Sequence, residues 1–288
     1  MRSAPLGIAM MKRPARVLVS ILCPLFAASM PAHADDPFFP PAPNAAIAMA
    51  KPALAPQPPQ PAKAPALVEP QLHVARSGNA ARPRVALTFD ACMGKTDDRI
   101  LSVLVSERIP ATIFVTARWL RGNPQALEIL LRNPDLFELE NHGQNHIPAV
   151  DVPASIYGII AAGSSDAVHQ EVFGGAQAMM AAGIAQPGWF RGSTAKYDAS
   201  AIRQIRDMGY RIAGYSLNGD GGSLLGAALA EKKIAAAKDG DVVIAHINQP
   251  THAAGEGVAR AILSLKKRGV EFVRLSDTSE TGDHDTTR

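Results

Sequence analysis

The chain has 288 residues, of which 47% are hydrophobic and 19% are charged, and its formal net charge is +3. Four of the 29 basic residues and none of the 26 acidic residues lie within residues 1–34, which leaves 25 basic residues against 26 acidic residues in the rest of the chain. This balance gives no reason to expect nucleic acid or an acidic membrane as a partner.

Residues 1–34 have the pattern of a secretory signal peptide. Basic residues come first, an apolar run follows from Val17 to Ala28, and Ala32-His33-Ala34 provides small residues at the cleavage position. The apolar run is too short to span a bilayer as a helix. We therefore expect cleavage after Ala34, a periplasmic or secreted mature protein, and no transmembrane anchor once the signal is removed.

Cysteine usage restricts the mature chain further. Cys23 lies within the expected signal, so Cys92 is the single cysteine that remains and no intramolecular disulfide can form. A free thiol in an exported protein is most commonly buried, where it packs as a small apolar group.

Residues 35–80 are rich in proline and alanine. The stretches 37-PFFPPAP-43 and 56-PQPPQPAKAP-65 have no apolar period, and proline repeatedly removes the N–H that a helix or a sheet needs. We therefore expect an extended, disordered linker. A folded domain should follow at residues 82–276, and a frayed polar tail at residues 277–288.

The domain at residues 82–276 alternates short apolar runs with amphipathic segments, which is typical of an α/β fold with a largely parallel sheet. Strands are expected at residues 84–90, 111–116, 136–142, 188–192, 210–217, 241–247 and 271–276. Helices are expected at residues 97–108, 125–132, 166–182, 199–208, 224–238 and 256–268. Seven βα-type units fit a closed or nearly closed (β/α)7-8 barrel better than an open doubly wound sheet, and the chain lacks both glycine-rich nucleotide-binding fingerprints.

Polar residues gather at the predicted strand ends, where a barrel of parallel strands carries its chemistry. These ends hold Asp90, His142, Arg191, Asp220 and His246, and His146 follows four residues after His142. An H-x-x-x-H pair on one helical turn faces the same way and suits a divalent metal, with Zn²⁺ preferred and Co²⁺ or Ni²⁺ as alternatives.

The order and spacing of these motifs are similar to those of a known family. TFD at 88–90, HGQNH at 142–146, FR at 190–191, the aspartate at 220 and IAH at 244–246 resemble the successive motifs of polysaccharide deacetylases of the NodB-homology type, carbohydrate esterase family 4. The resemblance covers residues 82–276, which is the whole of the expected folded domain.

The resemblance implies a distorted (β/α) barrel and metal-dependent hydrolysis of N-acetyl, or sometimes O-acetyl, groups on sugar polymers. It implies that Asp90 is the base that deprotonates a metal-bound water and that His246 is the general acid. It further implies that Arg191 fixes the base, that Asp220 tunes His246, and that His142 and His146 bind the metal. Such roles suit amide hydrolysis, which needs an activated water and a proton for the departing amine.

The first motif departs from the family pattern, because TFDAC stands in place of TFDDG and Ala91 occupies the position of a metal-binding aspartate. Three hypotheses remain. The metal is held by His142, His146 and waters; or another residue substitutes for the aspartate, either Cys92 as a thiolate or Glu140, two residues before His142 on the same strand face; or the domain has lost catalysis and kept glycan binding.

A second departure follows Arg191. The family continues with prolines and a glycine that shape an oxyanion-binding loop, whereas this chain reads 190-FRGSTAKYD-198. Gly192 still allows a close backbone approach. Gly192, Ser193 and Tyr197, together with Asn248 after His246, are the candidate substrate-binding residues.

The sequence therefore predicts an exported metal-dependent polysaccharide deacetylase, with peptidoglycan or another N-acetylhexosamine polymer as substrate. A catalytically impaired glycan-binding barrel is the alternative that Ala91 motivates, and a hydrolase of other acyl or amide substrates is a third hypothesis. The sequence indicates neither one particular polysaccharide nor an oligomeric state.

Overall fold

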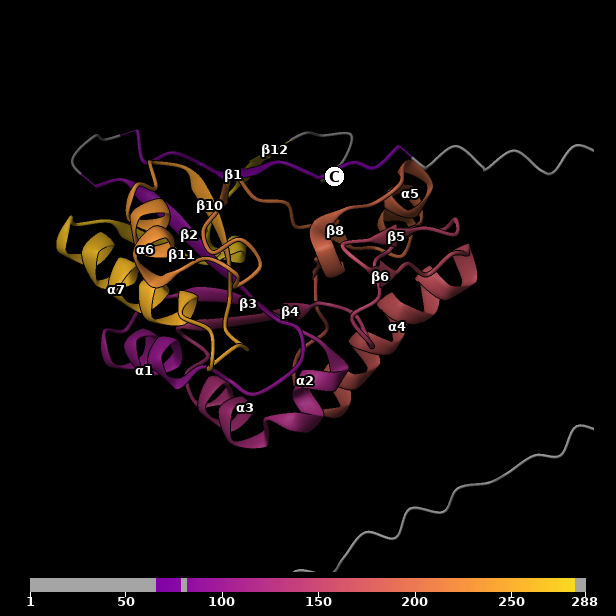
Figure 1. The fold of residues 1–288 in the computed structure, drawn as a ribbon, viewed down its shortest axis with the longest axis horizontal. Coiled ribbons are helices and arrows are strands. Elements are labelled where there is room, and N and C mark those ends of the chain that lie inside the picture. The colour runs from indigo at the N-terminus through magenta and orange to yellow at the C-terminus, as the bar shows by residue number, and fades with distance from the viewer. Residues whose placement is uncertain (1–65, 79–81, 283–288) are drawn as a thin grey trace, which may run out of the picture. The chain divides into compact units, whose positions relative to one another are not determined.

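The computed structural model describes residues 66–78 and 82–282. The expected signal peptide and most of the expected linker lie outside the described residues, as does the end of the polar tail. Parallel strands flanked by helices make up the described part, which confirms the α/β class and the distorted barrel (Figure 1). Among the described residues, no helix has both the length and the apolar character needed to cross a membrane.

The main sheet is built on parallel strands that follow one another along the chain. Its order is β12-β1-β10-β2-β3-β4-β7-β8, with β11 paired to β2 and β9 paired to β10. The parallel strands are β2 (Arg84–Ala91), β3 (Ala111–Val115), β4 (Phe137–Asn141), β7 (Trp189–Phe190), β8 (Arg211–Ile212), β9 (Leu217–Asn218), β10 (Asp241–His246) and β11 (Glu271–Val273).

Strand β2 lies at the centre of this sheet. It pairs with β10 along one edge from Val85 to Asp90, while β3 and β11 share its other edge. The register places His246 directly beside Asp90. Two residues that lie far apart in the sequence are therefore neighbours at the carboxyl ends of adjacent strands.

Two antiparallel strands extend the fold beyond its expected boundaries. Strand β1 (Leu72–Val74) lies in the expected linker, β12 (Glu280–Gly282) lies in the expected polar tail, and the two pair with each other (Figure 1). Leu72 and Val74 are buried, so this short run adds apolar side chains to the core. It follows a proline-rich stretch, and for that reason the sequence pattern places it in the linker. The ordered domain is thus longer at both ends than residues 82–276.

The chain before β1 is also part of the fold. Val68 and Tyr197 form an isolated antiparallel bridge, in which the Val68 N–H donates to the Tyr197 carbonyl at 2.7 Å and the Tyr197 N–H donates back at 2.9 Å. The Pro70 carbonyl accepts from the Tyr215 N–H at 3.3 Å. Residues 66–74 are consequently fastened along the fold.

Helices cover the sheet, and several begin at residues that satisfy their free N–H groups. The helices are α1 (Asp98–Ser106), α2 (Ala117–Gly122), α3 (Pro124–Leu131), α4 (Ser165–Ala181), α5 (Ala199–Asp207), α6 (Ala227–Ala235) and α7 (Ala254–Lys267), with 3₁₀ turns at Ser193–Ala195 and Leu275–Asp277. The side chains of Asp97, Thr116, Ser164 and Asp198 accept N–H groups at the starts of α1, α2, α4 and α5.

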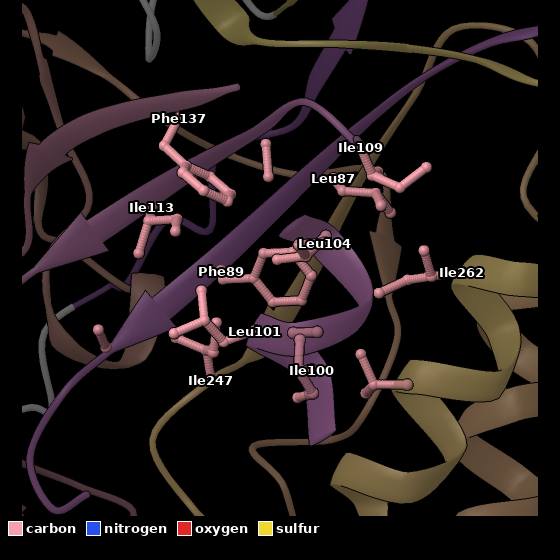
Figure 2. Close-up of a cluster of buried hydrophobic side chains, with 14 of the residues drawn as sticks. Leu87, Phe89, Ile100, Leu101, Leu104, Ile109, Ile113, Phe137, Ile247 and Ile262 are labelled. Atoms are coloured by element: carbon pink, nitrogen blue, oxygen red, sulfur yellow. The ribbon is translucent and has the colours of Figure 1, made fainter. Parts of the chain in front are cut away.

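The main core lies between the sheet and helices α1, α6 and α7. Leu87 and Phe89 point from β2 toward Leu104 of α1 and Ile262 of α7 (Figure 2). Side chains of a strand alternate between its two faces, so Val85, Leu87, Phe89 and Ala91 all join this core. Thr88 and Asp90 therefore point to the opposite face.

Three local features differ from the expected elements. The strand expected at residues 210–217 is divided into β8 and β9, and Gly214 between them packs so close to Pro70 that an added Cβ would lie 2.1 Å from the Pro70 carbonyl oxygen. Helix α2 was not expected from the sequence, and neither was the hairpin of β5 (Ser155–Ile156) and β6 (Ile159–Ile160). These segments are too short to show a clear apolar period.

Candidate active site

Four strand ends bring the candidate site together. Asp90 lies at the end of β2 and His246 at the end of β10, while His142 and Arg191 directly follow β4 and β7. The side chain of Asp90 accepts a hydrogen bond from Arg191, and its Oδ2 lies 3.8 Å from His142 Nε2. The structure therefore joins four of the residues singled out from the sequence in one cluster.

Arg191 fixes the carboxylate of Asp90. Its Nη1 donates to Asp90 Oδ1 at 3.1 Å and to Thr88 Oγ1 at 2.9 Å, and its other nitrogens donate to the carbonyls of Ala213 and Gly214. The arginine is fully buried. Burial raises the pKa of Asp90, but the positive charges of His142 and Arg191 lower it by more. The net pKa is therefore below its ordinary value, and the carboxylate stays ionised.

Asp220 orients His246. Its Oδ1 lies 3.0 Å from His246 Nδ1, and its Oδ2 accepts the backbone N–H of His246 at 2.7 Å. Since an ionised carboxylate can only accept, Nδ1 carries a proton, and the other side of the ring faces the Cys92 side chain. Burial lowers the pKa of His246, but Asp220 raises it more, which leaves the pKa well above its ordinary value.

A second group of side chains lies beside this pair. Potential ligand atoms of Cys92, His142 and His146 all lie within 4.8 Å of one another. Cys92 Sγ lies 3.4 Å from His142 Nε2, and the other ring nitrogen of His142 donates to the Arg191 carbonyl at 2.5 Å. A thiolate with two imidazoles fits a divalent metal such as Zn²⁺. Because Nδ1 of His142 contacts the backbone, Nε2 is available to bind the metal.

The electrostatics of this group favour an anionic sulfur. Burial raises the pKa of the Cys92 thiol, but the adjacent His142 lowers it by more, so the net pKa lies well below its ordinary value. The thiolate form is the one that binds metals. The free thiol therefore occupies the kind of surroundings that a ligand needs.

The histidine pair is held by a loop, and the expected helical turn is absent. Residues 142–146 contain no helix, and Gly143 and His146 have φ values of 90° and 64°. Glycine takes such a φ without strain, whereas histidine takes it at a cost. The surrounding structure must therefore hold His146 in place.

Glu171 of α4 supplies that support, although no sequence pattern predicts this role. Its buried carboxylate accepts the N–H of Asn145 at 2.9 Å and that of Ile147 at 3.1 Å, on either side of His146. Its carbonyl accepts the Gln144 N–H at 2.9 Å. Ser193 Oγ lies 3.3 Å from His146 Nδ1 and further fixes the ring. Glu171 thus connects α4 to the loop that carries His146.

Close packing of α4 on this loop requires glycine. A Cβ at Gly175 would lie 2.3 Å from Asn141 Oδ1 and 2.7 Å from the carbonyl carbon of Gly143. Two adjacent glycines in a predicted helix, Gly174 and Gly175, are the sequence signal that could have indicated such an approach.

Glu140 lies outside the cluster, contrary to one of the sequence alternatives. Its carboxylate accepts the Trp189 N–H at 2.8 Å, and burial raises its pKa to about 8. The same-face argument needed the strand to continue through His142, but β4 ends at Asn141. Glu140 therefore stays inside the fold, away from Cys92 and the two histidines.

The candidate substrate-binding residues are buried. Tyr197 is fully buried and its hydroxyl accepts the Gly192 N–H at 2.7 Å, so this N–H is already used and the ring lines no open groove. Ser193 is turned toward His146, and the Asn248 amide donates to the Met93 carbonyl. These contacts show all four residues supporting the loops of the site, in place of the expected exposure to substrate.

The family comparison agrees with this geometry. The profile of the family described as polysaccharide deacetylase matches residues 77–213. No curated protein sequence matches the chain.

Several solved structures are similar to this fold. A mutant of BA3943, a family 4 pseudoenzyme from Bacillus anthracis with restored enzymatic activity, aligns with a TM-score of 0.56 and 19% identity over 69% of this chain and 68% of that chain. PdaA of Bacillus subtilis, a family 4 carbohydrate esterase, aligns with a TM-score of 0.55 and 19% identity over 69% and 82%.

A third similar structure is a family 4 carbohydrate esterase from Streptomyces lividans in complex with acetate. It has a TM-score of 0.54 and 17% identity over 68% of this chain and 92% of that chain. At these identities the likeness shows a shared fold, and the family profile adds the relationship in sequence. Residues 77–213 therefore match the polysaccharide deacetylase family in sequence, and the chain shares its fold with solved family 4 carbohydrate esterases.

Proposed function

We propose that this protein hydrolyses N-acetyl groups on a polysaccharide, with Asp90 as general base and His246 as general acid. One observation carries the proposal. Asp90 and His246 are register partners on adjacent strands, and their separate partners shift their pKa values in opposite directions. A lowered carboxyl pKa and a raised imidazole pKa give one ionised base and one protonated acid at neutral pH, which is the division of roles that hydrolysis needs.

The reaction assigns one proton transfer to each residue. Asp90 accepts a proton from a water molecule as the water oxygen attacks the acetyl carbon. Arg191 keeps the Asp90 carboxylate ionised and oriented toward that water. His246 donates the Nε2 proton to the nitrogen as the carbon–nitrogen bond breaks, and Asp220 stabilises the charged ring before the transfer. Acetate and a free amine result, and exchange with solvent restores both residues.

His142 and His146 are the residues that would hold a divalent metal. Such a metal, when bound, would lower the pKa of the attacking water and polarise the acetyl oxygen. His142 is oriented for this by the Arg191 carbonyl, and His146 by Ser193 and by the loop that Glu171 supports. The site residues thus support metal dependence, with Zn²⁺ the preferred ion and Co²⁺ or Ni²⁺ as alternatives.

The family relationship supports a polysaccharide as the substrate, and the signal-like residues 1–34 support a periplasmic or secreted location. Peptidoglycan or another polymer of N-acetylhexosamine would be available to a protein in either place. We propose these polymers as the substrate class.

A glycan-binding protein without activity is the second candidate function. Ala91 supports it, because this residue is buried in the main core and has no side-chain atom that binds a metal. One structurally similar protein, BA3943, is a pseudoenzyme. Saturable binding to a polysaccharide with no acetate release at any added Zn²⁺, Co²⁺ or Ni²⁺ would favour this candidate.

Acetate release from chitooligosaccharide and from peptidoglycan tests the proposal. We expect Asp90→Asn to reduce the rate by about 10²–10⁴-fold, which is the usual contribution of a general base. Asp166→Asn changes an exposed aspartate on α4 and is the matched control. Full activity in Asp90→Asn, with the control also active, would reject the assigned base.

His246→Ala provides an independent test of the acid. His169 is exposed on α4, so His169→Ala is its control. We expect a loss of activity only in His246→Ala. A proton donor matters less when the leaving group is a weak base, so a substrate with an activated ester should lose less activity than the natural amide.

A further inference from the structure

Cys92 lies where the missing metal ligand is needed. The side chain of Ala91 is buried in the main core with Phe89 and has no atom that could bind a metal. Cys92 directly follows β2, which ends at Ala91, and its side chain is turned to the two histidines of the site. Its distance of 3.4 Å from His142 Nε2 agrees with that placement.

The backbone around Cys92 is fixed by both neighbouring strands. The Thr116 hydroxyl donates to the Cys92 carbonyl, and the Thr116 N–H donates to the Ala91 carbonyl at 3.3 Å. The Ile247 N–H donates to the Asp90 carbonyl at 3.1 Å, and Asn248 donates to the Met93 carbonyl. The sulfur is therefore positioned by the sheet itself.

We propose that Cys92 is the third protein ligand of the metal, which gives a Cys-His-His site in place of the family's Asp-His-His site. In a tetrahedral zinc site with ordinary bond lengths, neighbouring ligand atoms lie about 3.3–3.6 Å apart. The separation of Cys92 and His142 already has this value, and all three ligand atoms lie within 4.8 Å of one another. A small closing movement of His146 completes the geometry.

The other acidic residues near the site are committed elsewhere. Glu140 accepts the Trp189 N–H, and Asp90 is held by Arg191. Among the described residues, the one group of three or more potential ligands that meets is Cys92, His142 and His146. A sulfur donor also sets the class of metal, because thiolates favour Zn²⁺, Co²⁺ and Cd²⁺ over Mg²⁺ and Mn²⁺.

Cobalt binding tests this ligand without any turnover. In the full chain carrying Cys23→Ser, Cys92 is the single thiol. We expect added Co²⁺ to give a near-ultraviolet thiolate-to-cobalt charge-transfer band, and we expect Cys92→Ser to abolish it. Metal affinity in Cys92→Ser should fall by more than the roughly 10–100-fold lost when a residue that only orients a ligand is removed.

Two further variants keep the test decisive. Cys92→Asp should bind Co²⁺ without the charge-transfer band, since a carboxylate replaces the sulfur, and circular dichroism should show that it is folded. His146→Ala should lower the affinity while His169→Ala, on the surface of α4, leaves it unchanged. The proposal would be overturned if the parent chain bound Co²⁺ without a charge-transfer band or did not bind Co²⁺. It would also be overturned if Cys92→Ser kept the Co²⁺ affinity of the parent chain.

This inference rests on the proposed function only for the role of the metal in catalysis. The cysteine ligand and the deacetylase activity can each be rejected without the other. A charge-transfer band with no acetate release under any condition would retain the cysteine ligand and reject the deacetylase. Acetate release that is unaffected in Cys92→Ser, with no band in the parent chain, would reject the ligand and retain the deacetylase.

Discussion

The two faces of β2 carry different tasks on the same eight residues. The face turned to the helices, with Leu87, Phe89 and Ala91, is packed into the main core (Figure 2). The other face presents Thr88 and Asp90 to Arg191. Because side chains alternate, substitutions on the first face should change the free energy of unfolding, whereas substitutions on the second should change chemistry and metal binding.

Phe89→Ala should give the largest effect on stability. It removes a ring that is buried among Leu104 and Ile262, and such a change lowers the free energy of unfolding by about 3–5 kcal/mol. Denaturant unfolding measures this loss, and acetate release per folded molecule should be little changed. A variant that keeps its stability but loses activity would show that the two faces are not separable.

Ala91→Asp and Cys92→Asp sharpen the comparison with the same new side chain at adjacent positions. A carboxylate at position 91 would be buried without a partner, at a cost of about 3 kcal/mol in the free energy of unfolding. A carboxylate at position 92 should cost less and should bind metal. Unfolding and metal titration of both variants check this. Tighter metal binding in Ala91→Asp without a loss of stability would contradict the assigned faces.

Glu171→Ala should weaken the site from a distance. It leaves the Asn145 and Ile147 N–H groups without their acceptor, and the loop that positions His146 is loosened. We expect metal affinity to fall by about 10–100-fold, with partial recovery in Glu171→Gln, which keeps one acceptor oxygen. Calorimetric metal titration measures both, and Gln170→Ala, an exposed neighbour on α4, is the control. Equal affinity in all variants would exclude a positioning role.

Glu140 makes stability depend on pH away from the site. Its pKa rises from 4.5 to about 8 on folding, so between these values the folded chain binds more protons than the unfolded chain. The free energy of unfolding should therefore fall by roughly 3–4 kcal/mol between pH 5 and pH 8. Glu140→Gln should remove this part of the dependence, while Glu128→Gln, at an exposed position, should retain it.

Asp220→Asn should produce the smallest of these changes, a shift in the pH profile. His246 donates a proton only when protonated, so activity falls as the pH rises through its raised pKa. Removing the charge of Asp220 lowers that pKa and should move the descending limb of kcat/KM about 1–3 units to lower pH. Rates measured from pH 6 to pH 10 would show it, and an unshifted limb would mean that another group is the acid.

The sequence predicted the elements that carry the site better than the loops that shape it. Apolar runs ending in Asp90, His142 and His246 marked strands β2, β4 and β10, because a buried parallel strand reads directly as such a run. The number of these units predicted a barrel, and the family resemblance implied that it is distorted. The register that sets His246 beside Asp90 needed the structure, since pairing is a long-range property.

Contacts between distant residues account for what the sequence could not show. Glu171 lies 25 positions from His146, and its role depends on how α4 approaches the loop. Tyr197 was expected at the substrate and is buried instead, because its hydroxyl finds the Gly192 N–H. The side on which position 91 falls depended on the exact end of β2, which sequence patterns place only to within a few residues.

The bridge between Val68 and Tyr197 makes the last part of the expected linker a strap on the active-site loop. A version of the chain trimmed to begin at residue 82 would lose this strap along with β1. The residues that follow Arg191 would then lack the backbone hydrogen bonds between Val68 and Tyr197. Proteolysis between residues 66 and 82 would act in the same way. The leading segment can therefore be shortened only as far as the strap if the catalytic arginine is to keep its surroundings.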